Sequence, residues 1–365
     1  MPTRAEADVE TYGALDSLPA DVGDLFRNAR TIFGRRAWWR VIQDHGMPAG
    51  TATQFVVCRL NSVPAALFPM QTTGGDLESL TTPYTCLYEP LLGDGLQLAE
   101  RRQVFTVFAK FCAKRPVTRL DALDSNSGLF EECAADARAA GLGVIRFTHF
   151  ENWYEPVAGV GWSAYLAARP GALRETVRRK LRRAERDASA RFEIFHAADD
   201  IEPGIAAYET VYRKSWKEPE PFPEFNAALM RALAPTGVLR LGVFYIGGEP
   251  IAVQFWIVDG GKAIVLKLAH DEAFKAASPG TVLTAFMLRH LLDEERVAEI
   301  DFGRGNDRYK RDWTSRSRQR AGLVLVNPWR ARGLAMLARH AAGRARAAFR
   351  CGPTDTSSDA NSLQP

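Results

Sequence analysis

The chain has 365 residues, of which 46% are apolar and 25% charged, an ordinary globular composition that is long enough for two cores. Its formal net charge of +4 is too small to indicate nucleic acid or an acidic membrane as a partner. The five cysteines form no CxxC pair, so the sequence predicts neither a metal site nor a disulfide framework. This cysteine usage is typical of a cytoplasmic protein. No long apolar run is present, so no membrane span is expected.

The first half alternates helical and strand patterns. Helices are expected over 24–33, 36–44, 96–114 and 129–140, and strands over 53–60, 65–70, 83–88, 117–120 and 143–147. The turn at Asn61-Ser62 joins the first two strands into a hairpin. Residues 151–170, rich in Trp, Tyr, Gly and Pro, are expected to link the two halves.

In the second half, glycine and proline residues mark the ends of the expected elements more clearly. Helices are expected over 173–186, 200–217, 225–233, 281–295 and 306–313, and strands over 191–195, 239–246, 250–258, 263–269, 298–302 and 322–326. Three prolines between 219 and 223 stop the second helix in a stiff loop. The element order partly repeats that of the first half, which predicts an internal duplication.

The C-terminal segment divides in two. Residues 331–350 are rich in arginine and contain no acid, which predicts a basic helix that caps the fold or stays loose. Its apolar face is mostly alanine, so any peripheral association with a membrane is expected to be weak. Residues 351–365 are polar and predicted to be a disordered tail.

Four strings in the chain resemble the GNAT acyltransferase superfamily. They are FENWYEP leading into YLAARPGALRETVRRKLRR (150–183), GVFYIGGEPIAVQFWI (242–257), ASPGTVLTAFMLRHL (277–291) and IDFGRGNDRYKRDWT (300–314). The chain is similar in particular to two-domain CelD/BcsL-like acetyltransferases of polysaccharide biosynthesis, relatives of the Fem peptidyltransferases. The resemblance implies an α/β (α+β) fold of two tandem GNAT-like domains, each a mixed, mostly antiparallel sheet flanked by helices. The degenerate domain would span 1–160 and the working one 161–330.

The resemblance also implies acetyl-CoA or another acyl-CoA as co-substrate and no metal. A helix N-terminus has free N–H groups that suit a phosphate, so the donor is expected at the start of the helix over 281–295. The implied contacts are Leu268, Ala269, Lys275, Ser278, Gly280 and Thr281. One departure is that the family's R/Q-x-x-G-x-G/A loop reads KAASPG here, with one glycine. The alternative is that Ser278 is merely a helix cap and Pro279 a first-turn proline.

Residues 301–313 are the expected centre of the chemistry. Acyl transfer needs a base and an acid, for which Asp301 or Asp307 and then Tyr309 are the candidates. Arg304 and Lys310 are candidates for clamping a phosphate or a sugar acid, and Trp313 completes this set. The alternative is a charged surface loop with local salt bridges.

Two further residues are candidates for acceptor binding. Trp216 lies in a loop that commonly lines the acceptor pocket in this superfamily, although an aromatic side chain there can also simply pack. Arg178 lies on the basic helix 173–186, which could face a phosphorylated acceptor or a tRNA, or only solvent. His270 is an outside candidate near the expected thioester. No Ser or Cys stands in a nucleophile elbow, which favours direct transfer.

Three hypotheses follow. The first is a cytoplasmic acyl-CoA-dependent N- or O-acetyltransferase acting on a small-molecule or saccharide acceptor, such as a cell-envelope or exopolysaccharide precursor, with no DNA partner. The second is a Fem-like transferase that uses aminoacyl-tRNA, which the missing glycines favour and the absence of a coiled-coil arm disfavours. The third is a non-catalytic accessory protein of polysaccharide synthesis.

Overall fold

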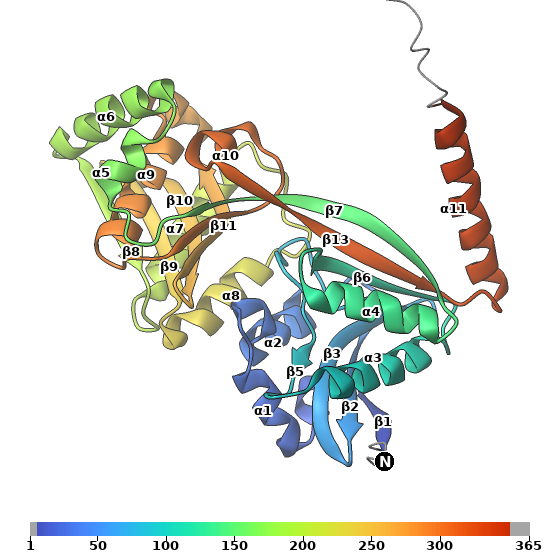
Figure 1. The fold of residues 1–365 in the computed structure, drawn as a ribbon. Coiled ribbons are helices and arrows are strands. Elements are labelled where there is room, and N and C mark those ends of the chain that lie inside the picture. The colour runs from blue at the N-terminus through green and yellow to red at the C-terminus, as the bar shows by residue number, and fades with distance from the viewer. Residues whose placement is uncertain (1–5, 351–365) are drawn as a thin grey trace, which may run out of the picture.

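A single sheet runs through both halves of the chain in the computed structural model, which describes residues 6–350 (Figure 1). Its strands are β1 (Ala7–Tyr12), β2 (Thr51–Leu60), β3 (Val63–Thr73), β4 (Asp76–Ser79), β5 (Leu91–Leu92), β6 (Val117–Asp124), β7 (Gly143–Pro156), β8 (Ala190–Phe195), β9 (Leu239–Ile246), β10 (Glu249–Asp259), β11 (Lys262–His270), β12 (Glu299–Arg304) and β13 (Arg316–Val326). The predicted mixed α/β class, with a mostly antiparallel sheet flanked by helices, is confirmed.

The helices lie around this sheet. They are α1 (Gly23–Arg27), α2 (Arg36–His45), α3 (Leu98–Cys112), α4 (Gly128–Ala139), α5 (Trp162–Ala167), α6 (Gly171–Arg186), α7 (Ile201–Arg213), α8 (Phe225–Leu233), α9 (Pro279–Asp293), α10 (Arg308–Trp313) and α11 (Ala331–Arg350). Within the described residues, no helix is both long enough and apolar enough to cross a membrane.

The two edges of the sheet show the same pattern of connections: four consecutive strands, then the next strand of that half, then a strand exchanged between the halves. It is β1-β2-β3-β4-β6-β13-β7-β12-β11-β10-β9-β8, with β5 paired to β3. Each half contributes antiparallel strands that end in one parallel pair, β4 with β6 and β11 with β12. This mirrored order is what a duplicated unit would produce.

The two halves are joined at the centre by exchanged strands. The last strand of the chain, β13, pairs with β6 of the first half over Arg320–Val326. The long strand β7 of the first half pairs along its length with β13 and reaches β12 of the second half over Asn152–Pro156. The predicted boundary near residue 160 stays a prediction, because the sheet continues across it.

The core lies on both faces of the sheet. In the second half, α5, α6 and α9 cover one face, where Trp256, Leu283 and Met287 are fully buried. Helices α7 and α8 cover the other face. There Phe225 of α8 meets Trp38 of α2 edge to face at 5.9 Å, which joins this core to that of the first half.

Two expected segments differ in the structure. Residues 83–88 form no strand, because Arg304 takes the carbonyl oxygens of Thr82 (3.1 Å) and Thr85 (3.4 Å) that a neighbouring strand would have bonded. The expected linker 151–170 is largely ordered structure, since β7 continues to Pro156 and α5 follows. The basic helix over 331–350 is present as α11, and the predicted tail 351–365 lies outside the described residues.

The strand exchange can be tested at Gly322 of β13. A Cβ there would lie 2.7 Å from the backbone oxygen of Leu120 in β6 and would overlap the ring of Phe147 in β7. We expect Gly322→Ala to lower the free energy of unfolding by about 1–3 kcal/mol, because the β6 backbone cannot move aside. Urea unfolding measures this change. The control is Gly171→Ala at the start of α6, where the nearest atom is a side-chain nitrogen at 3.7 Å; equal stability of both variants would contradict the packing of β13 against β6.

Candidate functional site

The parallel strands β11 and β12 part after three residue pairs. They pair from Lys262 with Glu299 to Ile264 with Asp301, and a cleft of about 200 Å³ opens beyond this point. Gly303 marks the parting point with a φ of +66°, and a Cβ there would lie 2.9 Å from the oxygen of Val265. Only glycine combines this conformation with so close a strand.

Both halves of the chain contribute to the walls of this cleft. Its lining residues are Pro83, Tyr84, Cys86, Lys217, Val265, Leu266, Lys267, Leu268, Phe302, Gly303, Arg304, Asp307, Tyr309 and Lys310. Four of them are cationic and one is a carboxylate, so the cleft favours an anionic ligand. The sequence predicted Leu268, Arg304, Asp307, Tyr309 and Lys310 as site residues, and the structure brings these five together.

Two of the four cations are already neutralised. Lys267 pairs with Glu220 at 2.6 Å and Lys310 with Asp307 at 3.1 Å. Lys217 forms no ion pair within residues 6–350, and burial, followed by the charge of Lys267, lowers its pKa. Arg304 donates only to neutral groups. The uncompensated charge of the cleft therefore resides on Lys217 and Arg304.

A network that sequence reasoning missed fixes the wall between the halves. The hydroxyl of Tyr84 donates to Glu220 at 2.6 Å, and the Lys267 ammonium lies 4.5 Å from the centre of the Tyr84 ring. Burial raises the pKa of Glu220, but Lys267 and nearby tyrosine hydroxyls outweigh it, so that the pKa lies below 4.5. Residues 84 and 220 are 136 positions apart, and no local pattern could have connected them.

Three groups at the cleft bear on acyl transfer. Burial, then the charge of Asp307, raises the pKa of Tyr309, so its hydroxyl stays protonated and can act as a donor. Asp307 keeps 61% of its side chain exposed and can accept a proton. Burial raises the pKa of Cys86 to about 12, so this thiol is a poor nucleophile.

Asp301 does not fit the role of a base. Its side chain is buried and lies outside the cleft lining. It accepts hydrogen bonds from Asn152 (2.6 Å) and from the backbone of Gly303 (2.7 Å), and pairs with Arg318 at 2.5 Å. These partners occupy both carboxylate oxygens. Asp301 therefore stabilises the fold at the point where β11 and β12 separate.

The start of α9 lies near the loop that follows α7. Ser278 precedes the helix with a φ of +55°, and its side chain makes no capping hydrogen bond. Gln254 holds the oxygen of Gly280 at 3.3 Å, and His270 stacks obliquely on Trp216 with ring centres 4.4 Å apart. A Cβ at Gly280 would meet only His270, at 3.5 Å. The amides of Gly280 and Thr281 make no backbone hydrogen bond outside the helix, so a phosphate fits here.

Three predicted contacts lie elsewhere, and a fourth, Lys275, stands directly before α9 but is already paired with a carboxylate. Ala269 and Trp313 are buried in the hydrophobic core and cannot touch a ligand. Lys275 is exposed and pairs with Glu272 at 3.3 Å. Arg178 lines an open groove on α6 together with four other arginines, away from the cleft. Core periodicity would have identified Ala269, but the short helix around Trp313 offered no such signal.

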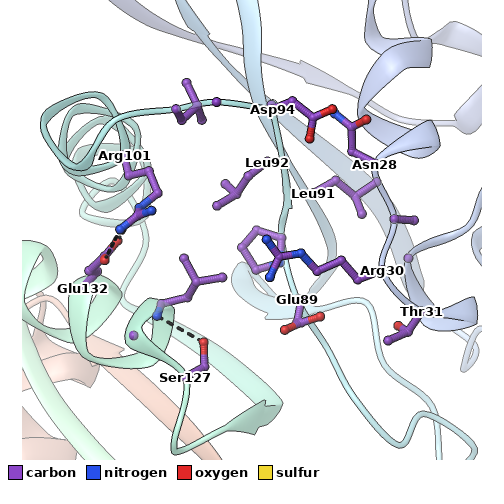
Figure 2. Close-up of a pocket in the computed structure, with 18 of the residues that line it drawn as sticks. Asn28, Arg30, Thr31, Glu89, Leu91, Leu92, Asp94, Arg101, Ser127 and Glu132 are labelled. Atoms are coloured by element: carbon purple, nitrogen blue, oxygen red, sulfur yellow. Dashed lines mark hydrogen bonds and ion pairs between the residues drawn. The ribbon is translucent and has the colours of Figure 1, made fainter. Parts of the chain in front are cut away.

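A roomier cavity of about 470 Å³ lies in the first half, between the starts of α3 and α4 (Figure 2). Arg30 and Glu89 point into it, whereas Arg101 is paired with Glu132 at 2.9 Å. Three carboxylates and two arginines line this cavity, and none of its residues borders the parted strands β11 and β12. We therefore place the candidate site in the smaller cleft. Among the described residues, no cluster of His, Cys, Asp and Glu is suited to a metal ion.

Comparisons with known proteins concern the family and the fold. Residues 171–311 match the family model Acetyltransf_6, described as an acetyltransferase (GNAT) domain. The match begins with α6 and ends within α10, so it contains β11, β12 and the start of α9. No curated protein sequence matches the chain.

Solved structures match over nearly the whole chain. The C-terminal domain of a protein described as a lysylphosphatidylglycerol synthetase from Agrobacterium fabrum has a TM-score of 0.55 and 13% identity, over 87% of this chain and 93% of that one. FemX has a TM-score of 0.55 and 10% identity, over 87% and 98%. A tandem GNAT protein from the clavulanic acid biosynthesis pathway has a TM-score of 0.50 and 11% identity, over 88% and 98%. At these identities the likeness extends to the fold, which is GNAT-like throughout, and the CelD/BcsL-like subtype remains a prediction.

The wall between the halves can be tested with a double-mutant cycle on Tyr84→Phe and Glu220→Gln. We expect a coupling of about 1.5–3 kcal/mol in the free energy of unfolding, because the hydrogen bond joins a hydroxyl to a buried carboxylate. Glu220 has a lowered pKa, so its contribution is present above pH 4.5 and is lost as the pH falls through that lowered pKa. Urea unfolding at several pH values measures both effects. Additive variants with unchanged pH dependence would contradict the network.

Proposed function

We propose that this protein is an acyl-CoA-dependent acetyltransferase that acts by direct transfer on the amine or hydroxyl of a saccharide, such as a cell-envelope or exopolysaccharide precursor. The observation that carries the proposal is the parting of β11 and β12 beside the start of α9, inside the segment that matches the GNAT model. A cytoplasmic location would follow from the donor, and the four cysteines between residues 6 and 350, which form no disulfide, are consistent with it.

The residues near α9 suit the donor. The free amides of Gly280 and Thr281, with Ser278 beside them, would hold the pyrophosphate through the partial positive charge of the helix start. A Cβ at Gly280 would meet only His270, at 3.5 Å, so a side chain larger than a methyl group there would fill the space in front of these amides. Leu268 would then border the thioester at the cleft.

The cleft would carry out the transfer with two side chains. The acceptor nitrogen or oxygen attacks the thioester carbonyl, and its proton passes to Asp307, directly or through water. The carbon–sulfur bond breaks, and Tyr309 gives its proton to the departing thiolate. Tyr309 suits this step because its raised pKa keeps it protonated before the reaction. Asp301 takes no part, and Cys86 forms no acyl intermediate because its thiol stays protonated.

The charges of the cleft bear on the acceptor. Lys217 and Arg304 are its uncompensated cations, so an acidic or phosphorylated saccharide would be favoured over a neutral one. Lys310 is fully engaged with Asp307 and the oxygen of Arg304, which leaves it a positioning role. Trp216, with half of its side chain exposed beside His270, would offer a flat surface to a sugar ring.

A second candidate is transfer of an aminoacyl group from tRNA. The observation that favours it is the open groove on α6, lined by Arg178, Arg179, Arg182, Arg183 and Arg186. A row of exposed arginines on one helix suits a phosphate backbone. The cleft chemistry would be unchanged in this case, because an ester carbonyl replaces the thioester.

Calorimetric titration with acetyl-CoA distinguishes these donors. We expect binding of roughly micromolar Kd that Gly280→Trp abolishes, because the indole would occupy the space before His270. The control is Gly343→Trp, on a position of α11 where a Cβ meets nothing within 4 Å. Absence of binding by the unaltered protein at millimolar acetyl-CoA would exclude the acyl-CoA proposal and favour the tRNA donor.

The role of Tyr309 can be tested by Tyr309→Phe. We expect thiol release from acetyl-CoA, with glucosamine 6-phosphate as the anionic probe acceptor, to slow by about 100-fold or more, because the leaving thiolate loses its proton donor. The affinity for acetyl-CoA should stay the same. Tyr12→Phe is the matched control, since the hydroxyl of Tyr12 contacts only Glu10 on the edge strand β1. An unchanged rate in Tyr309→Phe would remove this residue from the mechanism.

A further inference from the structure

Helix α11 is anchored only at its beginning. Gly333 is buried against the backbone of Asn327, and Met336 and Leu337 pack on a small cluster that includes Val324 and Val326 of β13. From residue 338 to residue 344 every side chain is exposed. Figure 1 shows the helix projecting from the end of β13, away from both halves of the sheet. Of the two roles expected for this helix, capping describes its first two turns, and beyond them the helix projects without packing on the sheet.

The charge of this segment has one sign. Residues 329–350 contain six arginines and no acidic residue. Arg332, Arg339 and Arg346 recur at intervals of seven, so they lie along one face of the helix. Arg332 pairs with Asp76 at 2.7 Å, whereas Arg339 and Arg346 form no ion pair within residues 6–350. The face therefore presents uncompensated positive charge to the solvent.

Large apolar side chains are exposed in the same segment of the chain as these charges, although Leu334 lies on another face of the helix than Arg332. Trp329, just before the helix, is 90% exposed, and Leu334 in its first turns is 58% exposed. Only five large hydrophobic side chains are this exposed in the described part of the chain, and these two lie within six residues of each other. Tryptophan and leucine next to arginines are typical of helices that lie at the boundary between lipid headgroups and acyl chains.

We propose that α11 and Trp329 bind an anionic membrane surface and thereby hold the cleft close to it. The charge complementarity determines the occupant: a surface of anionic lipid attracts each arginine and also accepts Trp329 and Leu334, whereas a nucleic acid gives the leucine no partner. The helix is held at one end and leaves its arginine face open, so binding needs no rearrangement of the sheet. This inference does not depend on the identity of the acyl donor.

Sedimentation of the full chain with lipid vesicles tests the proposal. We expect binding to vesicles of equal parts phosphatidylcholine and phosphatidylglycerol, little binding to phosphatidylcholine alone, and loss of binding as salt screens the charges. The double variant Arg339→Gln, Arg346→Gln should bind about 25-fold more weakly, roughly fivefold for each arginine. Trp329→Ala should weaken binding by the same factor at every salt concentration at which binding is still measurable, because its contribution is apolar.

The matched control is the double variant Arg178→Gln, Arg182→Gln, which removes two exposed arginines from α6. It should bind the mixed vesicles as the unaltered protein does. No vesicle binding, equal binding to both vesicle types, loss only in the α6 variant, or binding of added tRNA without binding of vesicles would each overturn the proposal. Acetyl-CoA titration of the α11 variant, expected to be unchanged, separates this outcome from a failure of the proposed function.

Discussion

One buried polar network holds the centre of this fold. Arg318 of β13 donates to Asn152 of β7 at 2.6 Å and pairs with Asp301 of β12, which in turn accepts from Asn152. Three strands that are far apart in the sequence are thereby fastened at one point, next to the place where β12 leaves β11. Breaking a buried charge pair from one side costs about 3–5 kcal/mol, so the register of these strands is firmly set. The cleft exists because β12 is held on one side while its end turns away at Gly303.

The exchange of β7 and β13 makes the two halves depend on each other. Strand β13, the last of the chain, pairs with β6 and completes the sheet of the first half. Strand β7, which comes before the second half in the sequence, pairs with β12 and completes the sheet of the second half. Such pairing has a large sequence separation, since Val117 of β6 bonds with Val326. The entropy cost of closing these long loops must therefore be met before the strand pairs can form and stabilise the sheet. We expect slow and cooperative folding for this reason.

Local patterns in the sequence predicted most elements and few of the contacts. The helices α6, α8 and α9 and the strands β9 to β11 begin and end within two residues of the expected positions, because their apolar periods and turn residues are local signals. Residues 83–88 look like a strand, yet Arg304, more than 200 positions away, donates to the carbonyl oxygens of Thr85 and of Thr82 just before this segment. Asp301 was predicted to be a base because the sequence shows a carboxylate at the end of a strand. The sequence does not show that Arg318 of β13 pairs with it. The wall made by Tyr84 and Glu220 required the tertiary fold.

The distribution of charges separates binding from chemistry in the cleft. Lys267 and Lys310 have carboxylate partners, so they stabilise the walls and contribute little net charge to a ligand. Lys217 and Arg304 have no carboxylate partner within residues 6–350, and they come from the loop after α7 and from the end of β12. Tyr309 and Asp307 are the groups there that can give and take a proton. In the proposed reaction, an anionic acceptor bound by Lys217 and Arg304 would meet both groups. Proton transfer to Asp307 would then weaken its ion pair with Lys310, so the proposed chemistry is coupled to one wall of the cleft.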